Sequence, residues 1–157
     1  MSHPSLHQLE EHAKFMRVAL RQARLAEKND EVPVGAVVVH DGSIISMAHN
    51  RSIGLNDPTA HAEILALRRA GKKLGNYRLT ACSLYVTIEP CAMCAGALVQ
   101  ARISQLVFGA RDMKAGACGS ALRVVNHPKL NHRVKVLRGV LAADSALLLR
   151  EFFRRRR

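Results

Sequence analysis

Tryptophan is absent from this sequence of 157 residues, and aromatic side chains make up only 4% of it. This scarcity argues against a broad platform of rings that stacks single-stranded bases, although a few well-placed rings suffice for a smaller site. Long apolar runs are also missing, since no uninterrupted stretch approaches the ~18 residues of a membrane span. The first residues, MSHPSLHQLEEHAK, lack the apolar core of a signal peptide. We therefore expect a cytoplasmic protein with no membrane partner.

Acidic residues are few. The chain has 12 Asp and Glu against 24 Lys and Arg, which gives a formal net charge of +12 with neutral histidines. Such an excess favours an electrostatic partner, most often nucleic acid. A soluble protein can also be basic without such a partner, so the charge alone leaves both interpretations open. The C-terminal string FFRRRR is the one run of like charge.

Cysteine is sparse as well, and the four residues of this type are Cys82, Cys91, Cys94 and Cys118. A chain of about 150 residues buries roughly 68–70% of its unfolded surface and needs no disulfide framework. The close spacing of Cys91 and Cys94 instead indicates metal or redox chemistry. Cys82 and Cys118 are best interpreted as small core residues.

Hydrophobic periodicity predicts helices that alternate with strands, which indicates an α/β fold with helices on both faces of a sheet. No linker or low-complexity segment divides the chain, so we expect a single domain over residues 1–157. The predicted elements are a helix over 5–28, a hairpin of strands 34–39 and 44–48, a helix capped by Asp57 and opened by Pro58 that stops at Gly71, a strand over 83–88, a helix opened by Pro90, a strand over 104–109, a short helical piece near Leu122, a strand over 133–137 and a helix over 142–153.

Two short motifs carry the chemistry, His61-Ala-Glu63 and Pro90-Cys-Ala-Met-Cys94. Cys91 and Cys94 are three residues apart and share one face of a helix, whose N-terminus favours the thiolate form. Two thiolates and the imidazole of His61 suit Zn²⁺. Three protein ligands leave the fourth position to water, as in catalytic sites, and zinc lowers the pKa of that water to about 7. Glu63 then has the chemistry of a proton shuttle.

Other interpretations of these cysteines stay open. Cys91 and Cys94 alone could form a redox pair at a helix start, but that leaves His61 and Glu63 without a role. A structural zinc site is possible if Cys82 or Cys118 supplies a fourth ligand. The protein would then be a nucleic-acid-binding module and not an enzyme. The number of ligands separates these two functions.

Longer strings carry a resemblance to a known family. An H-x-E motif followed by P-C-x-x-C is the signature of zinc deaminases. The chain resembles the bacterial tRNA-specific adenosine deaminase family from about residue 12 to its end. The strings that carry this resemblance are EVPVGAV (31–37), NDPTAHAE (56–63), LYVTIEPCAMCAGA (84–97), VFGARD (107–112), NHRV (131–134) and EFFR (151–154).

The resemblance implies a cytidine deaminase-like fold of three layers, α/β/α, with a central mixed five-stranded sheet, and a homodimer. It implies hydrolytic deamination of adenosine to inosine at the wobble position (34) of a tRNA, arginine tRNA above all, with the anticodon loop as partner. His61, Cys91 and Cys94 match the ligands of one Zn²⁺ per subunit, and Glu63 matches the general acid and base. A zinc deaminase for free bases such as cytosine or guanine is the alternative, and the charge of +12 argues against it.

Further residues are candidates for contacts to the substrate. Asn50 matches a position that contacts the bound nucleoside, Asp112 matches one near the substrate backbone, and main-chain groups near Ala62 could orient the base edge. The charge of the C-terminus suggests contacts to RNA phosphates, with helix packing for the two phenylalanines and a solvated tail for the arginines as alternatives. The candidate RNA-binding residues are Arg150, Phe152, Phe153, Arg154 and Arg155.

Overall fold

The computed structural model describes residues 3–156, which form four helices and five strands. In chain order the elements are α1 (Leu6–Lys28), β1 (Gly35–His40), β2 (Ser43–His49), α2 (Ala62–Leu74), β3 (Cys82–Ile88), α3 (Ala92–Gln100), β4 (Gln105–Ala110), β5 (Lys135–Arg138) and α4 (Ala142–Arg154). Within this part of the chain, no helix has the length and apolar character that crossing a membrane requires.

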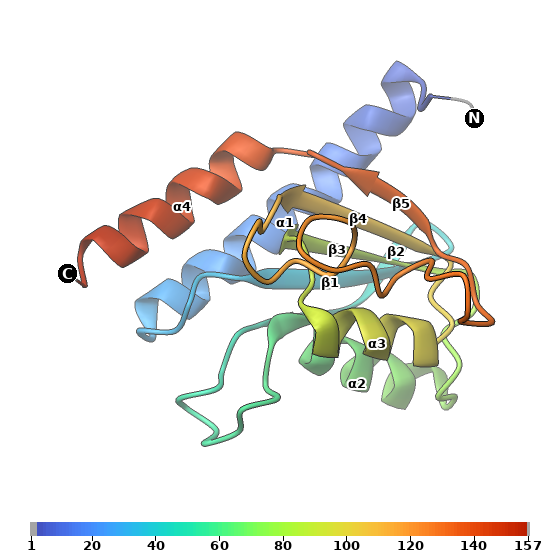
Figure 1. Ribbon diagram of the computed structural model, residues 1–157, viewed down its shortest axis with the longest axis horizontal. Helices are drawn as coiled ribbons and strands as arrows, with labels where there is room; N and C mark the ends of the chain where they lie inside the picture. The colour runs from blue at the N-terminus through green and yellow to red at the C-terminus, as the bar shows by residue number, and fades with distance from the viewer. Residues whose placement is uncertain (1–2, 157) are drawn as a thin grey trace.

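The five strands form one mixed sheet in the order β2-β1-β3-β4-β5. β1 pairs antiparallel with β2 and β3, whereas β3, β4 and β5 run parallel. Helices α1 and α4 cover one face of the sheet, and α2 and α3 cover the other (Figure 1). The α/β/α layers and the mixed five-stranded sheet expected from the sequence are confirmed.

Alternation along the strands divides the core into two parts. Val37 and Tyr85 belong to the cluster beneath α1, together with Phe15 of that helix. Their neighbours Val38 and Leu84 point the opposite way, into the larger cluster beneath α2 and α3. Because successive residues of a strand face opposite sides, each strand contributes to both clusters.

Helix α1 approaches β1 very closely at Gly35. A Cβ atom at this position would lie 1.9 Å from the backbone oxygen of Ala19 and 2.6 Å from the backbone nitrogen of Ala23. The first strand therefore requires glycine where α1 crosses it.

The predicted bounds of the second helix are wrong at both ends. Asp57 closes a turn, because its Oδ1 atom accepts hydrogen bonds from the nitrogen and hydroxyl of Thr59 at 2.8 and 2.7 Å. The helix begins at Ala62. It continues through Gly71 and ends at Gly75, which adopts the left-handed conformation with φ 66° that glycine favours at helix ends.

The helical piece predicted near Leu122 is also wrong. Residues 111–134 between β4 and β5 contain no helix, and a bridge pairs Cys118 with Arg123. The backbone N–H groups of Cys118 and Ser120 donate to the buried carboxylate of Glu89, and not to backbone carbonyls as they would in a helix. The other predicted elements begin and end within two residues of the observed bounds.

Candidate active site

His61, Cys91 and Cys94 converge where two helices begin. His61 occupies the N-cap position of α2 and Cys91 that of α3, and neither side chain caps its own helix. Nδ1 of His61 lies 3.6 Å from Sγ of Cys91 and 3.5 Å from Sγ of Cys94. The ligand atoms of these three residues all lie within 4.8 Å of one another.

The cluster has the dimensions of a tetrahedral metal site. Zinc bonds of ~2.3 Å to sulfur and ~2.05 Å to nitrogen, at the tetrahedral angle, separate sulfur from nitrogen by about 3.6 Å. The observed separations of 3.6 and 3.5 Å agree with this edge length. The donor set of two sulfurs and one imidazole nitrogen is also the one that zinc prefers.

The two remaining cysteines lie outside the cluster. Among the described residues, no fourth His, Cys, Asp or Glu joins the three that could hold an ion. Sγ of Cys82 lies 3.6 Å from Nδ1 of His40 instead. Cys118 lies outside the cluster, where its backbone N–H donates to Glu89 and its backbone pairs with Arg123. A three-ligand site is therefore favoured over a closed structural one.

The protonation states within the cluster suit a cation. Hydrogen bonds from Cys94 and His61 lower the pKa of Cys91 to about 3. The same contact with Cys91, together with burial, raises the pKa of Cys94. These shifts favour the thiolate at Cys91, and a bound metal ion would displace the proton of Cys94.

Glu63 brings a carboxyl group to the same helix end. It lies in the first turn of α2, two residues after His61, and only 3% of it is exposed. Burial raises the pKa of Glu63, so its carboxyl holds a proton more readily than an exposed glutamate does. A carboxyl with a raised pKa is suited to take up and release a proton in a reaction at neutral pH.

Asn50 connects the end of β2 to the start of α2. Its Oδ1 atom accepts a hydrogen bond of 2.8 Å from the backbone N–H of Ala62. Among the described residues its NH2 group donates to no acceptor. The N–H of Ala62 is engaged with Asn50, and contacts of Asn50 or of main-chain groups near Ala62 with a substrate stay predictions.

Asp112 closes a turn in the loop that follows β4. Its Oδ1 atom accepts hydrogen bonds from the backbone nitrogens of Lys114 and Ala115 at 3.0 and 3.1 Å. Its own N–H donates to Glu89 at 3.2 Å. The structure therefore gives Asp112 a part in shaping this loop, and its place near a substrate backbone stays a prediction.

Glu89 is a site residue that the sequence reasoning missed. It is 2% exposed, and its carboxylate accepts hydrogen bonds from the backbone nitrogens of Asp112, Cys118 and Ser120. Burial raises the pKa of Glu89. The three backbone hydrogen bonds and a fourth from the Ser120 hydroxyl lower the pKa by more, so that it falls below its ordinary value. The carboxylate thereby holds the loop over 112–120 beside Cys91. The signal available in the sequence for this role was the position of Glu89, an acidic residue that directly follows an apolar strand and precedes Pro90.

The candidate RNA-binding residues of the C-terminus lie on α4, across the sheet from the cluster (Figure 1). Phe152 is buried, and the guanidinium of Arg156 lies 3.6 Å above its ring. Packing is therefore the role that the structure gives Phe152. Phe153 is half exposed, and Arg150 is exposed.

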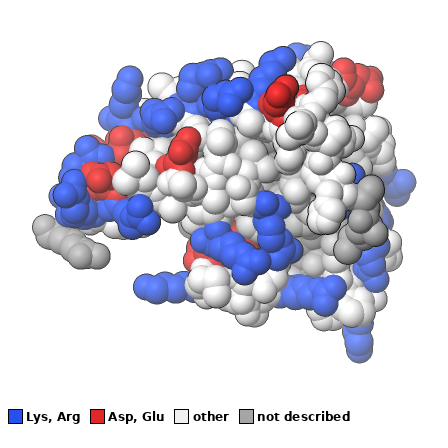
Figure 2. All heavy atoms as spheres, turned by 90° about the horizontal axis from the view of Figure 1, so that it is seen from above, with Lys and Arg blue, Asp and Glu red and all other residues white. Residues whose placement is uncertain are grey.

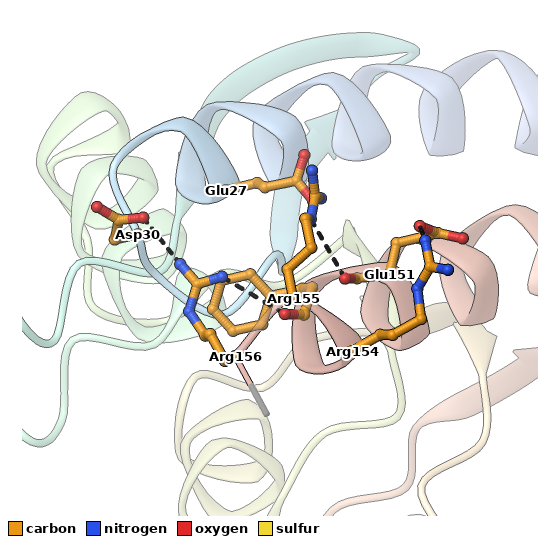
Figure 3. A network of polar contacts seen from close by, with 7 residues as sticks. Glu27, Asp30, Glu151, Arg154, Arg155 and Arg156 are labelled. Atoms are coloured by element: carbon orange, nitrogen blue, oxygen red, sulfur yellow. Dashed lines mark hydrogen bonds and ion pairs between the residues drawn. The ribbon is translucent and has the colours of Figure 1, made fainter.

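Acidic residues pair with the C-terminal arginines, as Figure 3 shows. Arg155 contacts Glu27 at 2.6 Å and Arg156 contacts Asp30 at 2.8 Å, which joins the end of α4 to the end of α1. Arg154 contacts Glu151 within α4. Through residue 156, ion pairs therefore hold the end of the chain to α1, and a role of these residues in RNA binding stays a prediction.

Comparison with known proteins agrees with this geometry. The model of the MafB19-like deaminase family matches residues 10–157, so the fold and the site define an enzyme of the deaminase class. The chain is 52% identical over 145 residues to the tRNA-specific adenosine deaminase of Haemophilus influenzae, covering 92% of this chain and 84% of that protein. It is 48% identical over 143 residues to that of Aquifex aeolicus, covering 91% and 94%. The chain belongs to the tRNA-specific adenosine deaminase family, as its strings predicted.

Solved structures give the same result. The chain is similar, with a TM-score of 0.84 and 48% identity, to a structure from studies of A-to-I editing by tRNA A34 deaminases at the wobble position of transfer RNA. That match covers 87% of this chain and 99% of the other. A guanine deaminase from Nitrosomonas europaea follows with a TM-score of 0.78 and 29% identity, covering 89% and 83%. The fold is thus common to deaminases of RNA and of free bases.

Proposed function

We propose that this chain hydrolytically deaminates adenosine to inosine at the wobble position, 34, of a tRNA, with arginine tRNA as substrate. The observation that carries the proposal is the buried carboxyl of Glu63 beside a three-ligand His/Cys/Cys cluster. The names of the relatives at 52% and 48% identity supply the substrate class. A tRNA substrate places the activity in the cytoplasm.

The cluster holds one zinc ion per subunit in this proposal, through Nδ1 of His61 and the sulfurs of Cys91 and Cys94. Zinc, when bound, lowers the pKa of a coordinated water to about 7. Glu63 accepts a proton from the attacking water and delivers it to N1 of adenine as the C–O bond forms at C6. It then takes the proton of the new C6 hydroxyl and passes it to the amino group. The C6–N bond breaks, ammonia leaves, and the C6 carbonyl of inosine remains, so that one water is consumed for each ammonia released.

Other residues orient the adenine and hold it away from the stacked bases of the RNA. The NH2 group of Asn50 donates to the adenine edge, while its Oδ1 stays bound to Ala62. The loop over 112–120, held by Glu89, lies next to the ribose and its phosphates, with Asp112 at its start. A nucleotide in an anticodon loop is already partly unstacked, which lowers the free energy needed to flip it.

A homodimer is part of the proposal, and its interface is the groove between α2 and α3. This groove has a volume of about 700 Å³ and is lined by apolar side chains that include Ile64, Leu67 and Ala97. Tyr77 at its rim is 74% exposed. An exposed apolar groove beside the helices that carry the ligands fits a second copy of the chain. Sedimentation of Leu67→Glu tests this interface, since the variant should be monomeric where the parent is dimeric.

A guanine or other free-base deaminase is the second candidate, favoured by the structural similarity to the Nitrosomonas europaea enzyme. A small neutral base does not need the net charge of +12.

The deciding experiment is incubation of the zinc-loaded protein with transcribed arginine tRNA that bears adenosine at the wobble position. Sequencing reads inosine as guanosine, and Glu63→Gln is the matched control because it keeps the shape of the side chain. We expect conversion at this position alone, reduced at least ~100-fold in the variant, with zinc content and tRNA binding unchanged. Absence of conversion by folded, zinc-loaded protein, with ammonia released from guanine, would establish the second candidate instead.

A further inference from the structure

Five cations form a single stripe along α1. Lys14, Arg17, Arg21, Arg24 and Lys28 follow one another at alternating steps of three and four residues, and all five are exposed. At 100° per residue they fall within an arc of about 80° on the helix surface, and they extend over about 21 Å of its length. We call these five residues the α1 stripe.

The α1 stripe lies opposite the buried face of the helix. Phe15, Met16, Ala19 and Ala23 are on that face and contact the sheet. The stripe therefore lies outside the core, although Nζ of Lys14 lies 5.6 Å from the centre of the Phe15 ring. Its charges face the solvent on the outer side of the molecule, and Figure 2 shows Lys and Arg side chains gathered along one edge of the α1–α4 face.

The stripe makes no direct contact with a carboxylate in the described part of the chain. Among residues 3–156, none of its five members forms an ion pair, whereas Arg154, Arg155 and Arg156 each contact a carboxylate (Figure 3). Glu27, the acid nearest to Lys28 along the helix, is engaged by Arg155. Cations three and four residues apart on a helix repel one another. The stripe thus weakens the isolated helix, which is explained if an anionic partner neutralises it.

The chemistry of the stripe selects a phosphate backbone. A helix that lies on a membrane exposes its apolar face, whereas the apolar face of α1 is buried against the sheet. Leu25 is the one large apolar side chain exposed between Arg17 and Lys28, at 41%. A nucleic-acid strand presents a charge about every 3.4 Å, so several phosphates fit along the length of the stripe.

The C-terminal end of the stripe is connected through the chain to the loop that precedes α2. Lys28 precedes Glu31 by three residues, and the buried carboxylate of Glu31 accepts hydrogen bonds from the backbone nitrogens of Ile53 and Gly54 at 3.1 and 2.8 Å. That loop continues to His61 and so to the cluster. The end of α1 is therefore linked through Glu31 to the loop before α2, while the stripe itself lies on the sheet face opposite α2 and α3.

We propose that the α1 stripe binds the phosphate backbone of the RNA stem that carries the target loop, an inference that rests on the proposed function and deepens it. The target base binds in the candidate active site. The stripe binds the stem of the same RNA, away from that site. The cations that contact RNA then lie on α1, whereas Arg154, Arg155 and Arg156 are ion-paired within the protein.

The test compares two triple variants of the full chain. Arg17→Gln, Arg21→Gln and Arg24→Gln together neutralise the stripe, and Lys73→Gln, Lys129→Gln and Lys135→Gln together remove the same charge from exposed positions elsewhere. Direct titration measures binding of arginine tRNA, of its isolated anticodon stem-loop and of an oligonucleotide of the loop alone. Thermal unfolding checks that both variants fold.

We expect the stripe variant to bind tRNA and the stem-loop about tenfold more weakly or worse at ~0.1 M salt. The slope of log affinity against log salt should fall by about two to three, one for each lost phosphate contact. Binding of the loop oligonucleotide, and turnover at saturating tRNA, should stay as in the parent protein. The second variant should match the parent in every assay.

Equal affinity and equal salt slope for the two triple variants would overturn the proposal. It would also be overturned if the stripe variant kept its tRNA affinity but lost binding to vesicles of anionic lipid. Failure of the proposed function is a separate outcome, because binding is measured without turnover. If the parent protein bound tRNA through the stripe but made no inosine, the reaction and not the stripe would be wrong.

Discussion

The Oδ1 atom of Asn50 accepts the backbone N–H of Ala62 at 2.8 Å, which fixes the end of β2 to the first turn of α2. This contact lies between the ligand His61 and the carboxyl of Glu63. The oxygen of the Asn50 amide thus holds the helix start, and its NH2 group is the donor that we propose for the substrate.

Substitutions at position 50 should separate these two roles. Asn50→Ala leaves the N–H of Ala62 without its partner and should lower the free energy of unfolding by about 1 kcal/mol. Asn50→Asp keeps an acceptor and should retain most of that stability. Both variants should lose kcat/KM on tRNA, on the order of tenfold or more, because both lack the donor. Urea unfolding and inosine formation measure the two effects, and full activity of Asn50→Asp would contradict the proposed donor.

The number of metal ligands is testable by metal analysis of purified variants. We expect one zinc per chain in the parent and in Cys82→Ser and Cys118→Ser, because neither residue belongs to the cluster. Cys94→Ser and His61→Ala should retain much less zinc, and the effect should be stronger after dialysis against a chelator. Loss of zinc from Cys118→Ser would show a fourth ligand and favour a structural site.

Alkaline pH should destabilise the fold through Tyr85. Burial, followed by the charge of Glu11, raises the pKa of Tyr85 to about 12. Since the unfolded chain loses this proton near pH ~10, the contribution of Tyr85 is complete below that pH and is lost as pH rises through about 12. Tyr85→Phe removes this dependence, although it also loses the 2.7 Å contact with Nδ1 of His12.

Urea midpoints of the two proteins from pH ~8 to ~12 measure the effect. We expect the parent to lose more stability than Tyr85→Phe above pH ~10. Curves that stay parallel over the whole range would show that the folded phenol titrates at its ordinary pKa.

Close packing of α1 on β1 should make Gly35 intolerant of any side chain. Gly35→Ala places a methyl group 1.9 Å from the oxygen of Ala19, so we expect a loss of about 3 kcal/mol in the free energy of unfolding. Gly54→Ala is the matched control, because its Cβ would meet nothing closer than 3.5 Å. It should change stability by no more than about 0.5 kcal/mol. Similar unfolding midpoints for both variants would refute this account of Gly35.

Local patterns in the sequence predicted most of the fold. Alternation along 34–39 and helical spacing along 5–28 placed these elements correctly, because each pattern reflects which face is buried. Asp57 and Pro58 misled the prediction because an aspartate can cap a tight turn as well as a helix. Gly71 was wrong as a helix end because glycine inside a helix is tolerated where its neighbours pack well.

Tertiary contacts explain what the sequence did not reveal about the site. The spacing of the two motifs identified His61, Cys91 and Cys94. Each motif lies at the start of a helix, and the three side chains meet because the fold places the starts of α2 and α3 together. The role of Glu89 depends on a loop more than 20 residues later, so no local pattern contains it. The pairing of Arg155 with Glu27 likewise joins opposite ends of the chain.

Positions 61 and 91 have a consequence for how this protein can be changed. At these two N-caps a serine, aspartate or asparagine would stabilise the helix by about 1 kcal/mol, as Ser5 caps α1. The chain forgoes that gain at both helices and places two residues of the candidate metal site there. Selection for thermal stability alone would therefore favour mutations that inactivate the enzyme, and any search for hardier variants must hold these two positions fixed.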